Sequence, residues 1–265
     1  MAVTHAKVSG LAAGDNTDEV RPSDWNAAHT VSIVNADVSA TAAIAETKLA
    51  LTNVHPSGAS THYTGFESDG TLVMHGNATV WEDLRVEPTV RGTGQNNPAF
   101  EKYLDNSTNN SIGVYLYSFP DEAANSENEV YFSMQMPHQW ASTPIYIHVH
   151  WIGSTSDTTA APRWGLEYAW VNIGGTYTDS TIIYAVTKFP VDADVTALKH
   201  YLTQFAAIDP STTANGLSSV LIGRLFRNSS DAADTYNVGG NKCGLLYIDA
   251  HYEADTLGSR SELAK

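Results

Sequence analysis

Residues 130–175 alternate between large apolar side chains and smaller or polar ones with a period of two, and this block constrains the fold most. A period of two places alternate side chains on opposite faces of an extended backbone. Such alternation is typical of antiparallel strands that pack one face in a core. The apolar positions of its two clearest strands are Ile145, Ile147, Val149 and Trp151, then Trp164, Leu166, Tyr168 and Trp170.

Short alternating runs recur along residues 79–256, separated by glycine, proline and polar turn residues. They include SIGVYLYSFP before the central block, and TIIYAVTKFPV, SSVLIGRLF and GLLYIDAHYEAD after it. We interpret TALKHYLTQF as a strand rather than a short helix. About eight strands at hairpin spacing predict an all-β domain over 79–256, a jelly-roll-like antiparallel β-sandwich, followed by a polar tail over 257–265.

Residues 1–78 differ from the rest, because large apolar residues are sparse and Trp25 is their single tryptophan. A segment of this kind becomes ordered by wrapping on another surface or by associating with copies of itself. We therefore expect an extended, sparsely packed anchor over 1–34 and a collar or linker over 35–78. Within the collar, NADVSATAAIAETKLAL is compatible with a short Ala-rich helix or with a three-chain stem.

Two stretches near the N-terminus, THAKVSG and VRPSDWNAAH, resemble a segment that recurs in bacteriophage tail-fibre and virion-appendage proteins. NADVSATAAIAETKLAL is similar to the collar segments that often follow it. The resemblance covers residues 1–55 and implies that the N-terminal part attaches the protein to the particle while the C-terminal part is exposed. The anchor residues that it implies are Arg21, Pro22, Asp24, Trp25 and Asn26.

A second resemblance covers residues 80–260, carried by MPHQW, IYIHVHW, WGLEYAWVNIGG, IGRLFRN and IDAHYEADTLGSR. These are similar to the C-terminal β domain of phage structural proteins known as tail fibres, head fibres or decorations. The resemblance implies a virion protein made in the host cytoplasm, a homotrimer, and capsid, neck or tail proteins as partners. It does not separate these three locations.

The composition excludes several classes of partner. The net charge is −15, and the 14 lysines and arginines are scattered, whereas a nucleic-acid groove needs concentrated positive charge. No apolar run is long enough to span a bilayer, so we expect no membrane insertion. The single cysteine, Cys243, excludes zinc sites built on two or more cysteines of this chain.

His148 and His150 form an H-x-H pair whose side chains share one strand face, so both imidazoles are placed to reach one metal ion. A third ligand would come from His138, His251 or an acidic residue. His251 shares a strand face with Asp249 and Glu253, and it joins the pair if its strand is a neighbour. We favour the alternative that these are polar, partly exposed histidines on the outer face of a sheet, and a third alternative is that they are buried, hydrogen-bonded histidines that fix the sheet or a subunit contact. The expected cofactor is therefore none, with His148, His150 and His251 as the candidates should a metal bind.

No catalytic motif is present: G-x-S-x-G, the P-loop and the dinucleotide fingerprint are all missing, so we expect a protein that is not an enzyme. The acidic residues Asp231 and Asp234 fall in a loop that reads as solvated. We expect Arg224 and Arg227 to pair with Asp249 or Glu253 on a neighbouring strand, or with another subunit.

The sequence thus favours a structural phage virion protein, a fibre or decoration subunit that projects a β-sandwich outward, with host attachment as its role. The alternative is a carbohydrate-binding, receptor-binding module that contacts a host cell-surface glycan through loop aromatics, Trp140 and Tyr177. A polysaccharide depolymerase is disfavoured, because the chain lacks the repeat period of a β-helix.

Overall fold

The computed structural model describes residues 53–54, 61–91, 97–121, 127–210, 216–237, 239–259 and 261–262. The chain divides into two units, Met1–Ala50 and Leu51–Lys265, and all of the described residues belong to the second. The predicted anchor residues Arg21, Pro22, Asp24, Trp25 and Asn26 and the predicted helix or stem after residue 34 therefore lie outside the described part of the chain.

The four-stranded sheet has the order β10-β9-β13-β7, and every neighbouring pair in it is antiparallel. Its inward face carries Trp164, Leu166 and Trp170 of β9, as the alternation predicts. Its strands are β7 (Asn128–Gln135), β9 (Trp164–Val171), β10 (Thr181–Ala185) and β13 (Val220–Arg227).

The seven-stranded sheet is built around β14 (Cys243–Ala254), the longest strand of the described chain. Along one side β14 pairs with β8 (Tyr146–Gly153), and along the other it pairs first with β6 and then with β4. The order is β11-β12-β8-β14-β6-β5, with β4 beside the C-terminal part of β14. The remaining members are β4 (Val80–Val86), β5 (Ala99–Leu104), β6 (Val114–Phe119), β11 (Lys188–Phe189) and β12 (His200–Gln204).

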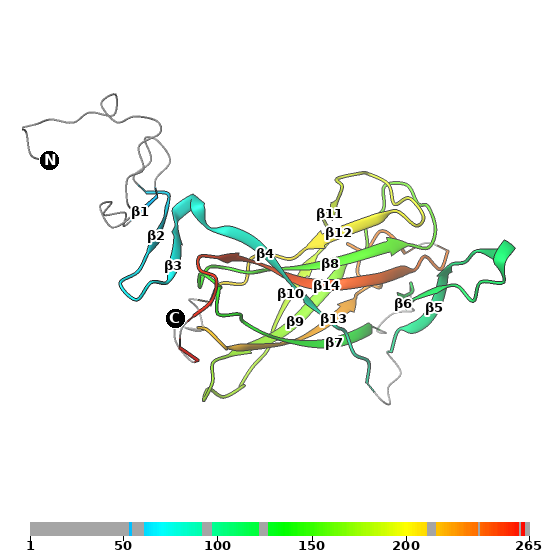
Figure 1. The fold of residues 1–265 in the computed structure, drawn as a ribbon. Helices are drawn as coiled ribbons and strands as arrows, with labels where there is room; N and C mark the ends of the chain where they lie inside the picture. Colours follow the sequence, from blue (N-terminus) through cyan, green and yellow to red (C-terminus); the bar gives the residue numbers. More distant parts are fainter. Residues whose placement is uncertain are drawn as a thin grey trace, which may run out of the picture. The chain divides into compact units, whose positions relative to one another are not determined.

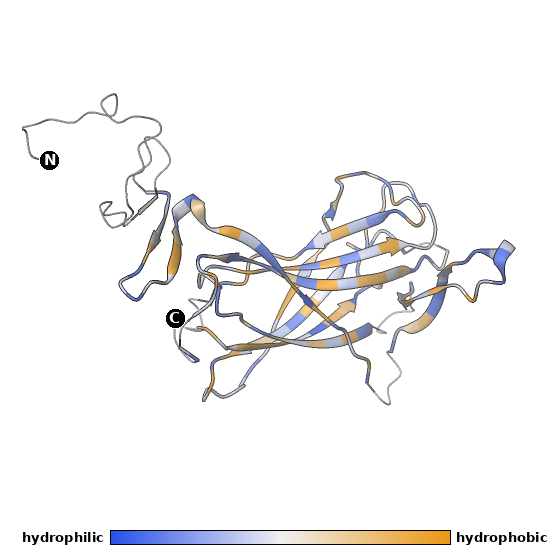
Figure 2. Ribbon diagram, viewed as in Figure 1, coloured by the Kyte–Doolittle hydropathy of each residue, from blue (hydrophilic) through white to orange (hydrophobic). Residues whose placement is uncertain are grey.

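The two sheets pack face to face and share one hydrophobic core (Figure 1). Apolar and polar residues alternate along the strands, so each sheet turns one apolar face inward (Figure 2). Trp140, Trp151 and Trp164 are fully buried in this core. The prediction of an all-β, jelly-roll-like antiparallel sandwich is confirmed, and the segment TALKHYLTQF contains β12 rather than a helix.

A small antiparallel sheet precedes the sandwich strands, in the order β1-β2-β3. Its strands are β1 (Asn53–Val54), β2 (Tyr63–Phe66) and β3 (Leu72–His75), within the range predicted as collar or linker. Val73 bridges to Thr256, just beyond β14. The helical segments described are single 3-10 turns, Gly76–Ala78 and Ser107–Asn109, and none of the described helices is long and apolar enough to cross a membrane.

Candidate functional site

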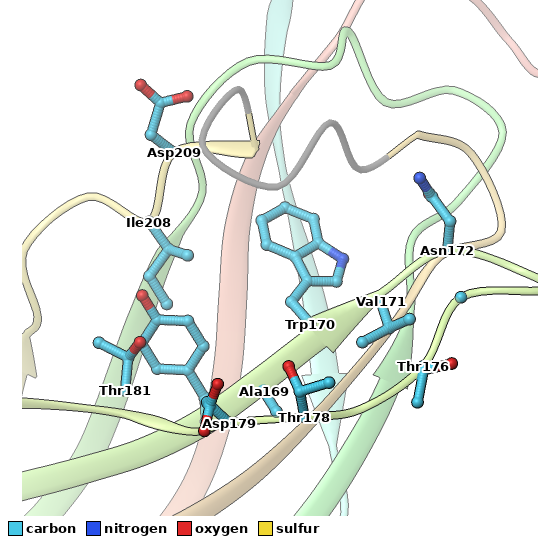
Figure 3. A pocket seen from close by; sticks show the side chains of 12 residues that line it. Ala169, Trp170, Val171, Asn172, Thr176, Thr178, Asp179, Thr181, Ile208 and Asp209 are labelled. Atoms are coloured by element: carbon cyan, nitrogen blue, oxygen red, sulfur yellow. The ribbon is translucent and has the colours of Figure 1, made fainter.

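A pocket of about 470 Å³ opens at the C-terminal end of β9 (Figure 3), and we call it the β9 pocket. Its lining comes from β9, from the loop over residues 172–180, from the start of β10, and from two residues that follow β12. The lining residues are Tyr168, Ala169, Trp170, Val171, Asn172, Gly175, Thr176, Thr178, Asp179, Thr181, Ile208 and Asp209.

Hydrogen bonds hold the wall of the β9 pocket in place. The indole Nε1 of Trp170 donates to Ser219 Oγ at 2.9 Å, and the Asn172 side chain accepts from the Gly216 amide at 2.8 Å. The chain turns away from β9 where Gly175 N donates to Asn172 O, and Gly174 adopts φ 81° in that turn, a conformation that glycine tolerates. The pocket therefore has a rigid strand on one side and a braced loop on the other.

The pocket combines hydroxyl and carboxylate groups with aromatic and aliphatic surface. Thr176, Thr178 and Asp179 are exposed, while Tyr168 is half-buried beside Trp170. Burial raises the pKa of the Tyr168 hydroxyl, so this group stays protonated at neutral pH and is able to donate a hydrogen bond. Hydroxyl, carboxylate and aromatic groups together are suited to a polyhydroxylated ligand, whose C–H faces stack on rings and whose hydroxyls hydrogen-bond.

The two predicted glycan-contact residues differ in their placement. Trp140 is fully buried, its ring centroid lies 5.4 Å from that of Trp170, and its Nε1 donates to Thr143 O. The prediction of a ligand contact at Trp140 is therefore wrong, because a loop position does not prevent the indole from packing into the core. Tyr177 is 44% exposed and donates its hydroxyl to Val220 O, and it stays a candidate beside the pocket.

A second hollow of about 580 Å³ lies over β7, β13 and β9 and includes Arg224. The Arg224 guanidinium pairs with Glu129 at 2.6 Å, Glu167 at 2.9 Å and Glu127 at 3.0 Å. The pKa of Glu167 is lowered by hydrogen bonds from Ser180 and from Arg224. These carboxylates neutralise the guanidinium, so Arg224 offers little attraction to an anionic ligand.

The predicted partners of the two arginines are wrong, because both arginines lie on β13 in the four-stranded sheet while Asp249 and Glu253 lie on β14 in the other sheet. Arg227 pairs instead with Asp234, at 2.9 and 3.0 Å, and both side chains are fully buried. Asp234 was expected in a solvated loop. The loop folds back under the guanidinium instead, so its carboxylate is buried.

β8 and β14 are neighbours, and their register places Asp249 opposite His148 and Tyr247 opposite His150. These side chains point away from the core, on the outer face of the seven-stranded sheet. Asp249 Oδ1 lies 3.3 Å from His148 Nδ1, and Asp249 Oδ2 lies 3.3 Å from His150 Nε2. We call His148, His150 and Asp249 the histidine–aspartate cluster.

The histidine–aspartate cluster is buried, although partly exposed histidines were expected. The prediction was wrong because neighbouring rings cover this part of the outer face: Tyr247 stacks on His150 with centroids 4.0 Å apart, and His251 packs against His148 at 5.2 Å. Burial alone would raise the pKa of Asp249, but the two imidazoles lower it to about 2. His138, His251 or an acidic residue was expected to complete the set, and the acidic residue Asp249 does so.

Comparisons with known proteins add little to this geometry. No protein-family model matches the chain, and no curated protein matches it either. Among solved structures, the chain is similar to a carbohydrate-binding module, CBM36, in complex with calcium and xylotriose, at 11% sequence identity and a TM-score of 0.26. The similarity covers 65% of this chain and 99% of that chain. At this TM-score it carries no inference about fold or function.

Proposed function

We propose that this protein is a non-enzymatic, structural subunit of a bacteriophage particle, a fibre or decoration, whose β-sandwich binds a host-surface carbohydrate in the β9 pocket. The observation that carries the binding role is the lining of this pocket. It sets exposed hydroxyl and carboxylate groups of Thr176, Thr178 and Asp179 beside the half-buried ring of Tyr168. Because one wall of the pocket consists of strand residues that are already ordered, fewer side chains lose conformational freedom when a ligand binds.

The virion role is supported by the sequence of residues 1–34, which resembles a phage anchor segment. In this proposal the anchor docks on another virion protein and the sandwich projects outward. Several sandwiches held on one particle multiply a weak carbohydrate contact by avidity. A millimolar site is therefore sufficient for attachment of the particle to a cell.

Self-association is part of the proposal, and exposed apolar side chains on the hairpin of β5 and β6 support it. Phe100 is 63% exposed. Its ring contacts two other rings of the hairpin, those of Tyr115 and Tyr117 on β6. Val114 and Leu104, paired in register, are also exposed. An apolar cluster of this kind marks a protein–protein contact, and we assign it to a second copy of this chain within a homotrimer.

An array of oligosaccharides from bacterial surface polysaccharides tests the binding role, followed by titration calorimetry with the best ligand. Thr178→Val removes a hydroxyl from the pocket, and Asp179→Asn replaces a charged acceptor oxygen with an amide donor. Neither change cuts into the core, and each is expected to weaken binding about tenfold, the loss of one hydrogen bond. Thr187→Val and Glu87→Gln, exposed positions outside the pocket lining, serve as matched controls. Ligand binding that none of the pocket variants weakens would overturn the assignment to this pocket.

The virion role has its own test. Mass spectrometry of particles purified from an infected culture is expected to detect this chain, and immunogold labelling should locate it on the head, neck or tail. A chain that never copurifies with particles would exclude the structural role. Release of reducing ends from host polysaccharide by the purified protein would exclude the non-enzymatic part of the proposal.

A further inference from the structure

The histidine–aspartate cluster contains polar atoms that the protein itself leaves unpaired. The side chains of His150 and Asp249 are 9% and 4% exposed, yet His150 Nε2 and Asp249 Oδ1 have no hydrogen-bond partner. The 3.3 Å separations bring nitrogen and oxygen close, but no hydrogen bond reaches either of these two atoms. Buried polar atoms without partners are costly, so something is expected to satisfy them.

The outer nitrogens of both imidazoles are already engaged. His148 Nε2 lies 3.2 Å from the side-chain oxygen Oε1 of Gln204, which only accepts, so the imidazole donates from Nε2 and Nδ1 is the nitrogen left to ligate a metal ion. His148 Nδ1 faces the Asp249 carboxylate, 3.3 Å from Oδ1. His150 Nδ1 lies 2.9 Å from His200 Nε2, and in the tautomer in which Nδ1 donates to His200, Nε2 of His150 is the ligating nitrogen. Metal-binding histidines show this arrangement, with the far nitrogen fixed by a hydrogen bond and the near one free to ligate.

The separations of the inner atoms fit a bound metal. Two ligand atoms that each lie about 2.1 Å from a metal are about 3.0–3.4 Å apart at octahedral to tetrahedral angles. The two nitrogen-to-oxygen distances of 3.3 Å fall in that interval, one to each oxygen of the Asp249 carboxylate. The three residues offer one ligand atom each within 4.8 Å of one another. Two atoms bound to one metal are at most about 4.2 Å apart, so the side chains draw closer together when the ion binds.

We propose that His148, His150 and Asp249 bind one divalent transition-metal ion of the zinc class, which joins β8 to β14 on the outer face of the seven-stranded sheet. Two imidazoles and one carboxylate form a donor set of intermediate softness that suits zinc and cobalt better than calcium or magnesium, which prefer oxygen ligands. This inference does not depend on the proposed function.

The role of this metal is structural. Neither the β9 pocket nor the hollow at Arg224 includes any of the three ligands, so neither gives a substrate access to the ion. His251 is placed to supply a fourth ligand. It lies two residues from Asp249 on the same strand face, its ring packs against His148, and its side chain is 34% exposed. Four protein ligands are usual for a closed structural zinc site.

The test uses tag-free full-length protein that has been stripped with a chelator. Titration calorimetry with zinc at neutral pH is expected to show one ion per chain. Cobalt is expected to give the visible absorption of a site with nitrogen and oxygen ligands. The thermal midpoint is expected to rise with zinc concentration and to return to its starting value with excess chelator.

Asp249→Asn keeps the shape of the side chain but removes its charge, and its zinc affinity is expected to fall at least 100-fold. Gln204→Leu leaves all three ligands in place and removes only the bond that orients His148, so a loss of about 10–100-fold is expected. His75→Ala, which removes a histidine of the small sheet, is the control and should bind zinc as the unaltered protein does.

Two results would overturn the proposal. One is that the stripped protein takes up no zinc or cobalt with a stoichiometry of one, in which case the cluster is a proton-sharing ion-pair network. The other is zinc binding that neither Asp249→Asn nor Gln204→Leu weakens, which would place the ion elsewhere. Circular dichroism of each variant separates loss of the site from loss of the fold, and Gln204→Leu still decides the matter if Asp249→Asn does not fold.

Discussion

Arg227 joins the two sheets through hydrogen bonds of its buried guanidinium. Its guanidinium makes two hydrogen bonds to Asp234 and one each to the carbonyl oxygens of Phe119, Asn241 and Tyr236. Phe119 ends β6 in the seven-stranded sheet, while Arg227 ends β13 in the other. One buried side chain thus ties a strand of each sheet to the loop that connects β13 with β14.

Substitution Arg227→Ala is expected to lower the free energy of unfolding by about 3–5 kcal/mol, because it leaves the buried Asp234 carboxylate without its partner. Arg227→Lys should recover only part of this, since an ammonium group cannot form the paired bonds to both carboxylate oxygens. Urea denaturation, monitored by tryptophan fluorescence, measures the free energy of unfolding of both variants. Arg85→Ala is the control: its side chain is 61% exposed in its pair with Glu87, and a loss of about 0.5 kcal/mol or less is expected. Equal losses at the two positions would refute this role of Arg227.

Cys243 illustrates how burial sets reactivity. It is fully buried, and the loss of solvation raises its pKa to about 12, against a lowering by the nearby Arg227. The thiolate is the reactive form, so the folded protein is expected to resist alkylation from neutral to mildly alkaline pH. The unfolded chain should be alkylated readily, and faster as the pH rises toward the ordinary thiol pKa. Iodoacetamide labelling read by mass spectrometry checks this, and rapid labelling of the folded protein would contradict it.

At the scale of strands, the alternation of side chains predicted which residues face the core but not which strands pair. Trp164, Leu166 and Trp170 are buried as expected. The partner of Arg224 was not predictable, because it depends on β13 lying between β9 and β7 in a sheet assembled from distant parts of the chain. The histidine–aspartate cluster depends on two further facts: that β8 lies beside β14, and that their register shifts between Leu245 and Tyr247. That shift turns Ile248 and Ala250 inward and Asp249 outward. A strict period of two counted from the inward-facing Leu245 would have turned Asp249 inward instead.

Gly165 of β9 lies under the ring of Phe226 on β13, and this close approach explains a glycine inside a central strand. A Cβ at residue 165 would lie 2.2 Å from Phe226 Cζ. The ring has little freedom to move, because it is 1% exposed and the Arg224 guanidinium stacks 4.1 Å from its centroid. Gly165→Ala is therefore expected to destabilise the fold by about 1–3 kcal/mol, the usual cost of overpacking.

The matched control is Gly216→Ala, where the nearest atom to the added Cβ lies 3.9 Å away and little change is expected. Because Phe226→Leu shortens the facing side chain, the double variant with Gly165→Ala should be less unstable than the sum of the two single changes. Thermal unfolding of the four proteins measures this coupling. Strict additivity would show that the Cβ does not meet the ring.

The molecule as a whole carries a net charge of −15, so copies of it repel one another unless a specific contact brings them together. Exposed apolar side chains on β5 and β6 are the proposed source of that contact. Because burial of apolar area is favourable and little affected by salt, association through this hairpin should persist and strengthen as salt screens the charge.

Multi-angle light scattering on the purified chain at micromolar concentration is therefore expected to give the mass of three copies. The double variant Phe100→Asp with Val114→Asp places two charges in the proposed contact and should shift the mass toward that of one copy. Both positions are more than half exposed, so the fold of the single chain should survive. Val191→Asp, at a residue that is 75% exposed outside the hairpin, controls for the added charge and should leave the mass unchanged. A single-copy mass for the unaltered chain at every salt concentration would exclude the trimer, whereas a trimer that survives the double variant would place its interface on another face.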